Sequence, residues 1–460
     1  MIYDIETYLK PGMRAHLVGI GGVSMSPLAE ALHGAGLVIT GSDIRESEVL
    51  DQLRALGIRI AVGHSADNIA GADLIIRTAA AREDNVEIAA ARQAGIPVFE
   101  RAQAWGSIMK NYKNAVCISG THGKTTTTSM TTHILMAADK DPTVMIGGTL
   151  PLLGAGHRVG KGDTIVLESC EYYNSFHSFF PTIAVILNVD ADHLDFFGDI
   201  ENVKRSFRTF AELVPEDGWV IYNHDDKNTV DAMRGIERRI LTFGLEEGAD
   251  VRAERVTLEG KHLRFDVTFR GEQFLHLELQ LPGRHNVYNA VAAVSAAIAM
   301  GIPADAVEKG LKNFRGAGRR FEFKGCLNGA EIYDDYAHHP GELRALLDAA
   351  LNMGYKRVIT AFQPHTYSRT KTHFDEFVNQ LRRADKVLLA EIYAAREKNT
   401  EGISSRSLAE AIPGAEYFPT FEEMEARLRE LASEGDIILT VGAGDIYKVG
   451  EAVAEPVEKA

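Results

Sequence analysis

The residues best suited to do chemistry lie in one short stretch, Gly120-Thr-His-Gly-Lys-Thr125, directly after the apolar run Val116–Ser119. A glycine-bounded loop between a strand and a helix turns backbone N–H groups toward phosphate oxygens. Lys124 adds a positive charge, and Thr125 adds a hydroxyl that can bind Mg²⁺. This combination predicts an ATP site. We expect the nucleotide to lie against Gly120, Thr121, His122, Gly123, Lys124, Thr125 and Thr126.

The loop differs from the common P-loop in the spacing of its glycines. The common pattern has four residues between them, whereas only Thr121 and His122 separate Gly120 from Gly123. This spacing argues against the ordinary kinase or GTPase lineages. A ligand-free turn rich in Gly and Thr is the alternative, and the Lys-Thr pair directly after Gly123 disfavours it.

Polar side chains follow two further strand patterns. One pattern ends at Glu168 and Glu171, and the other ends at Asn188, Asp190 and His193. Ligands bind at the carboxyl ends of parallel strands, and Mg²⁺ takes one or two carboxylates together with phosphate oxygens and water. These residues therefore predict a magnesium site beside the ATP loop. Taken singly, each could instead cap a strand or bond a neighbouring loop.

A second glycine-rich turn, Gly19-Ile-Gly21-Gly22, follows the first strand pattern of the chain. Asp43 comes after the next strand pattern, at the spacing of a ribose-binding acid in dinucleotide folds. Ser24 stands where the third glycine of that fingerprint belongs. The pattern therefore fits NAD, and it fits any other nucleotide diphosphate equally well.

Two polar groups remain in the second half of the chain. Asn286 and Asn289 open a long helical pattern on one face, where their amides could pair with an adenine edge or could cap and flank the helix start. His338 and His339 follow Asp334-Asp335 after a short strand pattern. No third metal ligand has suitable spacing, so we interpret this segment as a polar loop in a cleft.

Strand patterns alternate with helical patterns almost throughout, which predicts an α/β protein with parallel sheets. Three strand patterns lie in the last third of the chain, at residues 357–362, 386–390 and 436–441. Single cores seldom grow beyond about 250–300 residues, so 460 residues suggest about three domains. Polar residues between 104 and 112 mark a boundary before the ATP-loop strand.

Composition excludes several classes of protein. A net charge of −15 argues against general nucleic-acid or membrane-surface binding. Only three cysteines occur, without CxxC or HExxH, which suits a reducing compartment and disfavours disulfides and structural zinc. The start of the chain lacks a signal-peptide pattern, and no apolar run of about 18 residues occurs. We expect a cytoplasmic protein.

Together these motifs resemble the Mur ligases of peptidoglycan synthesis, whose shortened ATP loop matches residues 120–128. The resemblance runs from the first strand to the last, and it is strongest to the members that join L-alanine to UDP-N-acetylmuramic acid. The stretches that carry it are Gly19-Ile-Gly-Gly-Val-Ser-Met-Ser26, Asp190-Ala-Asp-His-Leu-Asp195, His285-Asn-Val-Tyr-Asn289, Gly318-Arg-Arg-Phe321, Asp334-Asp-Tyr-Ala-His-His-Pro340, Phe362-Gln-Pro-His-Thr-Tyr-Ser-Arg369 and Gly442-Ala-Gly-Asp-Ile446.

The resemblance implies three domains and assigns roles to matching residues. An N-terminal Rossmann-like domain (1–108) would bind the UDP-sugar, a central P-loop ATPase-type domain (109–314) would bind ATP, and a C-terminal Rossmann-like domain (315–460) would close on ATP and the amino acid. By match to the family motifs, Lys124 would hold the β/γ-phosphates, Thr125 and Glu168 would bind one Mg²⁺, and His193 would bind a second Mg²⁺. Asn286 and Asn289 would contact adenine, Asp335 the ribose, and Arg320 the phosphates. The amino acid or acyl phosphate would lie near Arg369, His365 and His338, and the UDP-sugar would contact Gly19, Gly21, Gly22, Ser24 and Asp43.

The chain departs from the family at two places, and it lacks a lysine that some sister ligases modify. Cys170 replaces the Asp of a Glu-Ala-Asp-Glu-Ser stretch, which leaves the surroundings of Glu168 open. Thr366 stands where many relatives have Arg, so Arg369 would act with different help. Sister ligases use a carbamylated lysine, but the corresponding residues here are Ser206-Phe-Arg208, so we do not expect that modification.

The implied reaction is ATP-dependent amide formation through an acyl phosphate, with Lys124, His193, Arg320 and Arg369 as catalytic residues and with domain closure during turnover. Three alternatives stay open: a recycling ligase that joins the UDP-sugar to a preformed tripeptide, a dehydrogenase, and a non-catalytic nucleotide-binding module. We expect a monomer or a homodimer.

Overall fold

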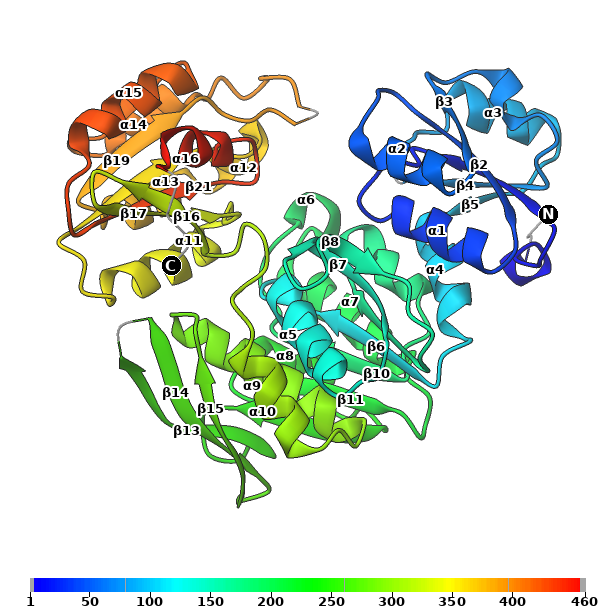
Figure 1. Cartoon of the computed structure of the whole chain (residues 1–460), viewed down its shortest axis with the longest axis horizontal. Helices are drawn as coiled ribbons and strands as arrows, with labels where there is room; N and C mark the ends of the chain where they lie inside the picture. Colours follow the sequence, from blue (N-terminus) through cyan, green and yellow to red (C-terminus); the bar gives the residue numbers. More distant parts are fainter. Residues whose placement is uncertain (1–3, 79, 260, 396, 456–460) are drawn as a thin grey trace. The chain divides into compact units, whose positions relative to one another are not determined.

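The computed structural model describes residues 4–78, 80–259, 261–395 and 397–455, which form three β-sheets with helices packed on them (Figure 1). Most neighbouring strands run parallel in each sheet, so the prediction of an α/β protein with parallel sheets is confirmed. Every helix in the described part of the chain is too short or too polar to cross a bilayer.

The N-terminal sheet has five parallel strands in the order β3-β2-β1-β4-β5. The strand order reverses between β1 and β4, and ligands bind at the carboxyl ends of strands near such a reversal. Its elements are β1 (Arg14–Val18), α1 (Ser26–Gly34), β2 (Val38–Asp43), α2 (Glu48–Ala55), β3 (Arg59–Val62), β4 (Leu74–Arg77), α3 (Val86–Gln93), β5 (Val98–Glu100) and α4 (Arg101–Met109), with short 3₁₀ helices η1 (Ile5–Thr7) and η2 (Ala66–Ile69).

The central sheet has the order β15-β14-β13-β12-β11-β10-β6-β9-β7-β8. Strand β6 lies between β10 and β9 and is parallel to both, so the loop after β6 is flanked by the ends of two buried strands. Its strands are β6 (Asn114–Ser119), β7 (Thr143–Leu150), β8 (Ala155–Arg158), β9 (Thr164–Glu168), β10 (Ile183–Ile186), β11 (Trp219–Asn223), β12 (Arg239–Gly244), β13 (Val251–Glu259), β14 (His262–Phe269) and β15 (Glu272–Leu279). Its helices are α5 (Lys124–Ala137), η3 (Tyr172–Ser178), α6 (Leu194–Phe197), α7 (Ile200–Glu212), α8 (Lys227–Met233), α9 (Arg284–Ala299) and α10 (Ala304–Lys312).

The C-terminal sheet has the order β16-β17-β21-β18-β19-β20, and only its first pair of strands is antiparallel. The three strand patterns at residues 357–362, 386–390 and 436–441 coincide with β18, β19 and β21. Its elements are β16 (Glu322–Leu327), β17 (Ala330–Asp335), α11 (Pro340–Leu351), β18 (Arg357–Phe362), α12 (Tyr367–Thr372), α13 (Phe374–Leu381), β19 (Lys386–Ala390), α14 (Ser405–Ala411), β20 (Glu416–Phe418), α15 (Phe421–Leu431), β21 (Asp436–Val441) and α16 (Tyr447–Val453).

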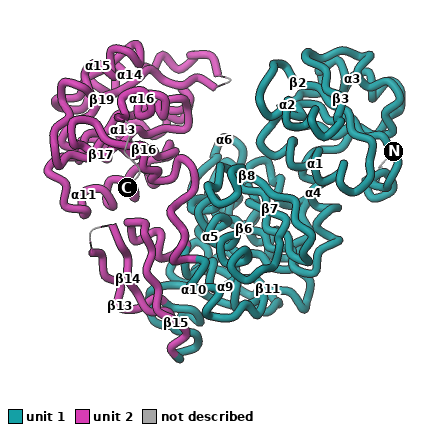
Figure 2. Tube along the Cα trace, in the orientation of Figure 1, with its two compact units in different colours: residues 1–252, 268–272, 290–310 teal, residues 253–267, 273–289, 311–460 magenta. Residues whose placement is uncertain are grey.

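The chain divides into two compact units that do not follow the predicted domain bounds (Figure 2). Unit 1 comprises residues 1–252, 268–272 and 290–310, and unit 2 comprises residues 253–267, 273–289 and 311–460. One cluster of buried apolar side chains runs through the N-terminal and central sheets, from Leu17 through Trp105 to Phe176. The boundaries at residues 108 and 314 therefore stay a prediction.

Helix α5 is unusual because it is rich in β-branched threonine, a poor helix former in isolation. Its side chains from Thr127 to Thr132 are almost wholly buried. Three hydroxyls, those of Ser129, Thr131 and Thr132, donate to the carbonyl four residues earlier, at 2.7–2.9 Å. Hydroxyls that bond within their own helix can be buried without a separate partner, so this helix forms a dry support behind the loop.

Candidate functional site

The loop after β6 has a backbone that only glycine fits well at two points. Gly120 has φ 143° and Gly123 has φ 85°. A Cβ on Gly120 would also lie 2.8 Å from the Cβ of Leu187. Asn188 holds the loop from the end of β10, because its side chain accepts the His122 N–H at 2.7 Å and donates to the His122 carbonyl at 3.0 Å. The loop is therefore preformed, with α5 beginning at Lys124.

Lys124 lies inside this loop and is paired with a buried carboxylate. Its Nζ donates to the carbonyls of Gly120 (2.5 Å) and Thr121 (3.1 Å) and to Glu171 Oε2 (3.0 Å). The side chain of Glu171 is 3% exposed. Burial lowers the pKa of Lys124, but Glu171, with smaller contributions from Cys170 and Glu168, raises that pKa above its usual value. Lys124 is thus a fixed positive charge at the mouth of the loop.

Thr125 and Glu168 form the second pair of groups beside the loop. The Thr125 hydroxyl donates to Glu168 Oε1 at 3.1 Å, and the Gly147 N–H donates to Glu168 Oε2 at 2.7 Å. Glu168 thus faces the hydroxyl predicted to bind Mg²⁺. A Cβ on Gly147 would lie 2.6 Å from Glu168 Oε1, so the bare backbone of β7 leaves room for this carboxylate.

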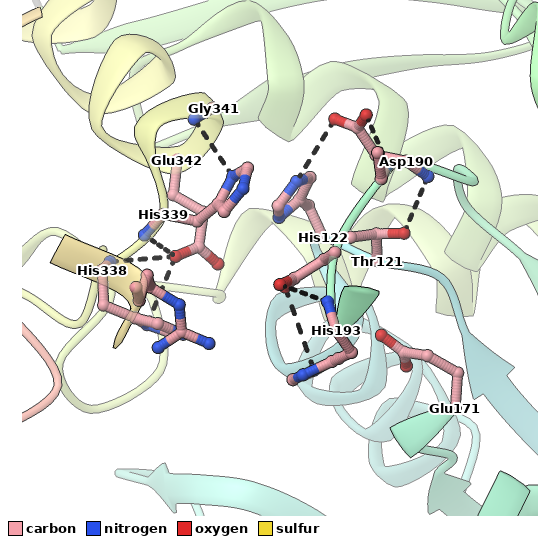
Figure 3. A network of polar contacts seen from close by, with 12 residues as sticks. Thr121, His122, Glu171, Asp190, His193, His338, His339, Gly341 and Glu342 are labelled. Atoms are coloured by element: carbon pink, nitrogen blue, oxygen red, sulfur yellow. Dashed lines mark hydrogen bonds and ion pairs between the residues drawn. The ribbon is translucent and has the colours of Figure 1, made fainter. Parts of the chain in front are cut away.

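His193 lies at the start of α6, in the loop that follows β10 (Figure 3). Its backbone is left-handed, with φ 54°, and its N–H donates to Asp192 Oδ1 at 2.7 Å. Its ring stacks on the ring of Tyr172 at a centroid distance of 4.2 Å. In the same loop, the Asp190 N–H donates to the Thr121 hydroxyl at 2.9 Å, which ties the Asp-His segment to the ATP loop.

The glycine turn of the N-terminal sheet is braced by the predicted ribose-binding acid. Gly19 has φ 78°, and the Gly21 N–H donates to Asp43 Oδ2 at 2.9 Å. The Gly22 N–H bonds back to the Gly19 carbonyl, which closes the turn before α1. The Ser24 hydroxyl contacts the sulfur of Met145 at 3.0 Å. Asp43 therefore shapes the turn and still has acceptor lone pairs.

In unit 2, Asn286 and Asn289 are both buried within the first turns of α9, at 5% and 6% exposure. Asn286 donates to the Pro282 carbonyl at 2.7 Å, and Asn289 donates to Asn286 Oδ1 at 3.2 Å. The N-cap alternative is wrong, because α9 begins at Arg284 and Asn286 is already inside the helix.

Two adjacent arginines in unit 2 have different surroundings. Arg319 is fully engaged, since it donates to Asp334 Oδ2 (2.9 Å) and to the carbonyls of Gly442 (2.6 Å) and Gly444 (2.9 Å). Arg320 has a single ion pair among the described residues, with Glu342 at 3.9 Å. The guanidinium of Arg320 also lies over the ring of Tyr336, at 5.2 Å from its centroid. Arg319 therefore holds its neighbours in place, whereas Arg320 is held less tightly.

Asp335 ends β17 and accepts two backbone N–H groups, from Phe321 and Ala337, each at 2.8 Å. Burial raises the pKa of Asp335 to about 6, and the positive charge of Arg320 opposes this shift. Each carboxylate oxygen keeps a lone pair for a further donor, so the predicted contact with a ribose hydroxyl is chemically open.

His338 and His339, which follow Asp335 along the chain, make different contacts (Figure 3). His339 caps α11, where its Nδ1 accepts the Gly341 N–H at 3.3 Å. Glu342 Oε2 accepts the His338 N–H at 3.0 Å and lies 3.4 Å from His338 Nδ1. No three His, Cys, Asp or Glu side chains of the described residues form a group that could hold a metal ion. The interpretation of this segment as a polar loop in a cleft stays a prediction.

His338 lies near His365, and His365 contacts Arg369; all three are predicted to contact the amino acid or acyl phosphate. Its ring lies 5.8 Å from that of His365, and His365 Nδ1 is 3.1 Å from Arg369 Nη1. Burial lowers the pKa of His365 to about 4, helped by the charge of Arg369, so the imidazole is neutral and can accept. The Thr366 backbone is strained, with φ 65°.

Most of the predicted residues thus lie in four groups, one of which is the pair of Asn286 and Asn289 on α9. Unit 1 holds the ATP loop with Glu168 and His193, and separately the glycine turn with Asp43. Unit 2 holds Arg320, Glu342, His338, His365 and Arg369 in a chain of contacts. The predicted magnesium site included Glu171 and Asn188, but their contacts with Lys124 and with the His122 backbone were not foreseen. Sequence reasoning assigned no role to Tyr172 or Arg319.

Comparisons with known proteins identify the relatives of this chain. Models of the Mur ligase family match residues 14–113 (catalytic domain), 118–297 (middle domain) and 319–444 (glutamate ligase domain). A UDP-N-acetylmuramate–L-alanine ligase of Caldanaerobacter subterraneus is 46% identical over 99% of this chain and 100% of its own length. A protein of the same name from Acetivibrio thermocellus is 47% identical over 95% of this chain and 94% of its own.

Solved structures agree with these relatives. The UDP-N-acetylmuramate-alanine ligase MurC of Thermotoga maritima superposes with a TM-score of 0.80 at 31% identity, covering 96% of this chain and 98% of that one. A murein peptide ligase of Psychrobacter arcticus gives a TM-score of 0.69 at 24% identity, covering 96% and 98%, and shows the shared fold. The three-domain α/β organisation is therefore confirmed, and the chain belongs to the Mur ligase family.

Proposed function

We propose that this protein is an ATP-dependent ligase that joins L-alanine to the lactyl carboxylate of UDP-N-acetylmuramic acid, releasing ADP and phosphate, in the synthesis of the peptidoglycan precursor. The observation that carries the proposal is the preformed loop from Gly120 to Thr125, with Lys124 held by Glu171, in a chain whose curated relatives of nearly equal length are named for this reaction.

The chemistry follows from what an amide bond requires. A carboxylate is a poor electrophile, so the γ-phosphoryl group of ATP is first transferred to the lactyl carboxylate oxygen. The amine of L-alanine then attacks the carbonyl carbon of the acyl phosphate, the C–O bond to phosphate breaks, and phosphate leaves. The protein supplies positioning and positive charge rather than covalent catalysis. Lys124 and Arg320 are the charges that we assign to the transferring phosphoryl group.

We assign Mg²⁺ to Thr125 and Glu168, with a second ion at His193. The residues fit this assignment, because the Thr125 hydroxyl and Glu168 Oε1 already face each other at 3.1 Å, and two oxygen ligands suit an ion that keeps phosphate and water as its other ligands. When bound, Mg²⁺ would neutralise phosphate charge. Tyr172, stacked on His193, would keep that imidazole in one orientation.

We place adenine at Asn286 and Asn289, the ribose at Asp335, and the amino acid at His338, His365 and Arg369. These residues lie in unit 2, whereas the ATP loop lies in unit 1. As the resemblance to the family implies, we propose that the C-terminal domain closes on the nucleotide and the amino acid during turnover. The glycine turn from Gly19 to Gly22 would receive the diphosphate of the UDP-sugar.

A coupled phosphate-release assay tests the proposal. The full-length protein would receive ATP, Mg²⁺ and UDP-N-acetylmuramic acid with L-alanine, with other amino acids, or with a preformed tripeptide. We expect phosphate release that requires both the UDP-sugar and L-alanine. Release only with the tripeptide would assign the recycling reaction instead, and no release with any acceptor would reject a ligase. We also propose that the enzyme acts in the cytoplasm, as a monomer or homodimer.

A further inference from the structure

A buried carboxylate, Glu87 on α3, lies in the N-terminal sheet and has no part in the proposed chemistry. Its side chain is 0% exposed. Oε2 accepts the Ser42 hydroxyl at 2.6 Å and lies 3.0 Å from His64 Nδ1, while Oε1 accepts from the Asn68 amide at 2.6 Å. His16 Nε2, also buried, lies 3.8 Å from Oε2. Burial raises the pKa of Glu87, but His16, Ser42 and Asn68 together outweigh burial and lower the pKa to about 2.

The ionised Glu87 fixes the orientation of one imidazole at the edge of the sheet. An ionised carboxylate only accepts, so the nitrogen of His64 that faces it, Nδ1, must carry the proton. In the neutral ring the other nitrogen, Nε2, then presents a lone pair. Glu87, His16 and Ser42 are sealed from solvent, whereas the side chain of His64 is 21% exposed. The buried hydrogen-bond network therefore ends at one partly exposed acceptor, Nε2 of His64.

His64 lies at the ligand-binding edge of the sheet. It follows the end of β3, and the preceding Gly63 N–H donates to the Asp43 carbonyl at 2.7 Å. The glycine turn after β1 suits a diphosphate and Asp43 at the end of β2 suits a ribose, so we expect the nucleobase toward the next strand outward, β3. Ile44, which follows Asp43, is 71% exposed and offers an apolar face to a base ring.

We propose that His64 is a specificity-determining residue for the nucleobase of the sugar nucleotide, with its Nε2 accepting the N3–H of uracil, and that Glu87 is the positioning residue that sets its tautomer. Uracil carries a hydrogen on N3, whereas cytosine presents a lone pair there, so this acceptor favours uridine over cytidine nucleotides. The inference rests on the proposed function, in which the N-terminal domain binds a UDP-sugar.

The substitution Glu87→Gln separates this role from simple packing. Asn68 donates one amide hydrogen to the Gly63 carbonyl at 3.1 Å and the other to Glu87 Oε1. A glutamine at position 87 must therefore place its oxygen toward Asn68 and its NH₂ toward Ser42 and His64. His64 Nδ1 then accepts, and its proton moves to Nε2. The outward nitrogen changes from acceptor to donor, which suits cytosine.

The test measures inhibition constants of UDP and CDP against UDP-N-acetylmuramic acid in the full-length enzyme. The two nucleotides share the same ribose and charge, so their ratio isolates the base. We expect the wild type to prefer UDP at least tenfold, Glu87→Gln to shrink or reverse this ratio at least tenfold, and His64→Ala to abolish it. His64→Ala should also raise KM for the UDP-sugar with kcat unchanged.

Asn85→Ala is the matched control, since Asn85 caps α3 through the N–H groups of Glu87 and Ile88 but does not touch His64. It should lower Tm and leave the UDP/CDP ratio unchanged. If Glu87→Gln fails to fold, the UDP/CDP ratio of His64→Ala still tests the inference, because His64 is partly exposed. A wild-type ratio in both variants, or an equal loss of both nucleotides, would overturn the inference. A wild type without L-alanine-dependent turnover would instead reject the proposed function.

Discussion

At the scale of single residues, the pairing of Lys124 with Glu171 decides how substitutions in the loop will behave. We predict that Lys124→Ala lowers kcat by about 10²–10³-fold or more, since it removes an oriented charge from the transferring phosphoryl group. It also leaves Glu171 buried without its cation, which costs about 3–5 kcal/mol of unfolding free energy. Phosphate release and urea unfolding measure the two effects.

The double variant Lys124→Met with Glu171→Gln is the control for stability. It removes both charges, so it should recover most of the unfolding free energy of the wild type while turnover stays lost. Near-normal turnover in Lys124→Ala would reject the assignment of this loop to phosphate.

The two buried asparagines of α9 give the second prediction. Because Asn289 donates to Asn286, replacing either residue with Ala disturbs both amides. We expect KM for ATP to rise by the equivalent of about 1–3 kcal/mol, with little change in KM for the UDP-sugar. Steady-state kinetics with each substrate varied in turn would decide it. A change in Tm with an unchanged KM for ATP would mean that these residues have only a structural role.

At the scale of elements, the turn between β1 and α1 depends on a bare backbone. A Cβ on Gly21 would lie 3.0 Å from both Asp43 Oδ2 and Leu50 Cδ2. We predict that Gly21→Val raises KM for the UDP-sugar and leaves KM for ATP nearly unchanged. Gly34→Val, at the end of α1, is the control, because its Cβ would have no atom within 4 Å. Equal kinetics in both variants would contradict the assignment.

Helix α3 is anchored to β2 and β3 through Glu87, which makes the N-terminal sheet sensitive to acid. The folded pKa of about 2 lies below the ordinary value of 4.5, so the stabilisation is present above pH 4.5 and is lost as pH falls from there toward 2. Between pH 6 and pH 3 the wild type should lose about 2 kcal/mol more unfolding free energy than Glu87→Gln. Urea unfolding followed by Trp105 fluorescence, with Trp219→Phe in both proteins, measures this difference. Parallel pH profiles would contradict it.

Elements with a strong local pattern could be predicted from the sequence, and contacts between distant segments could not. The runs at 357–362, 386–390 and 436–441 are short, apolar and bounded by polar residues, and they became strands at those positions. Strands β13–β15 were not predicted, because their apolar residues are interspersed with charged and polar ones and form no apolar run. The Lys124–Glu171 pair depends on the alignment of β6 with β9, which brings Ile118 beside Glu168, and no local pattern encodes that register.

At the scale of the whole molecule, the N-terminal sheet is joined to the central part of unit 1 through α4. A Cβ on Gly106 would lie 1.9 Å from the Ser178 carbonyl oxygen, at the end of η3. We predict that Gly106→Val forces α4 away from η3 and lowers Tm by several degrees, since overpacking typically costs about 1–3 kcal/mol. Ser107→Ala on the same helix should leave Tm within about a degree of the wild type. Calorimetry of the full-length variants would check this, and an unchanged Tm in Gly106→Val would show that the two parts separate freely.

The carboxylate of Glu171 has a consequence for how tightly the loop would hold a nucleotide. It occupies the ammonium group that we assign to a phosphate, so it would act as a tethered competitor that is always present. If the pair is formed nine-tenths of the time, the apparent affinity for a nucleotide falls about tenfold, because only the remaining tenth is ready to bind. The same reduction in apparent affinity applies to ADP. Either nucleotide would then need about a tenfold higher concentration to fill the site.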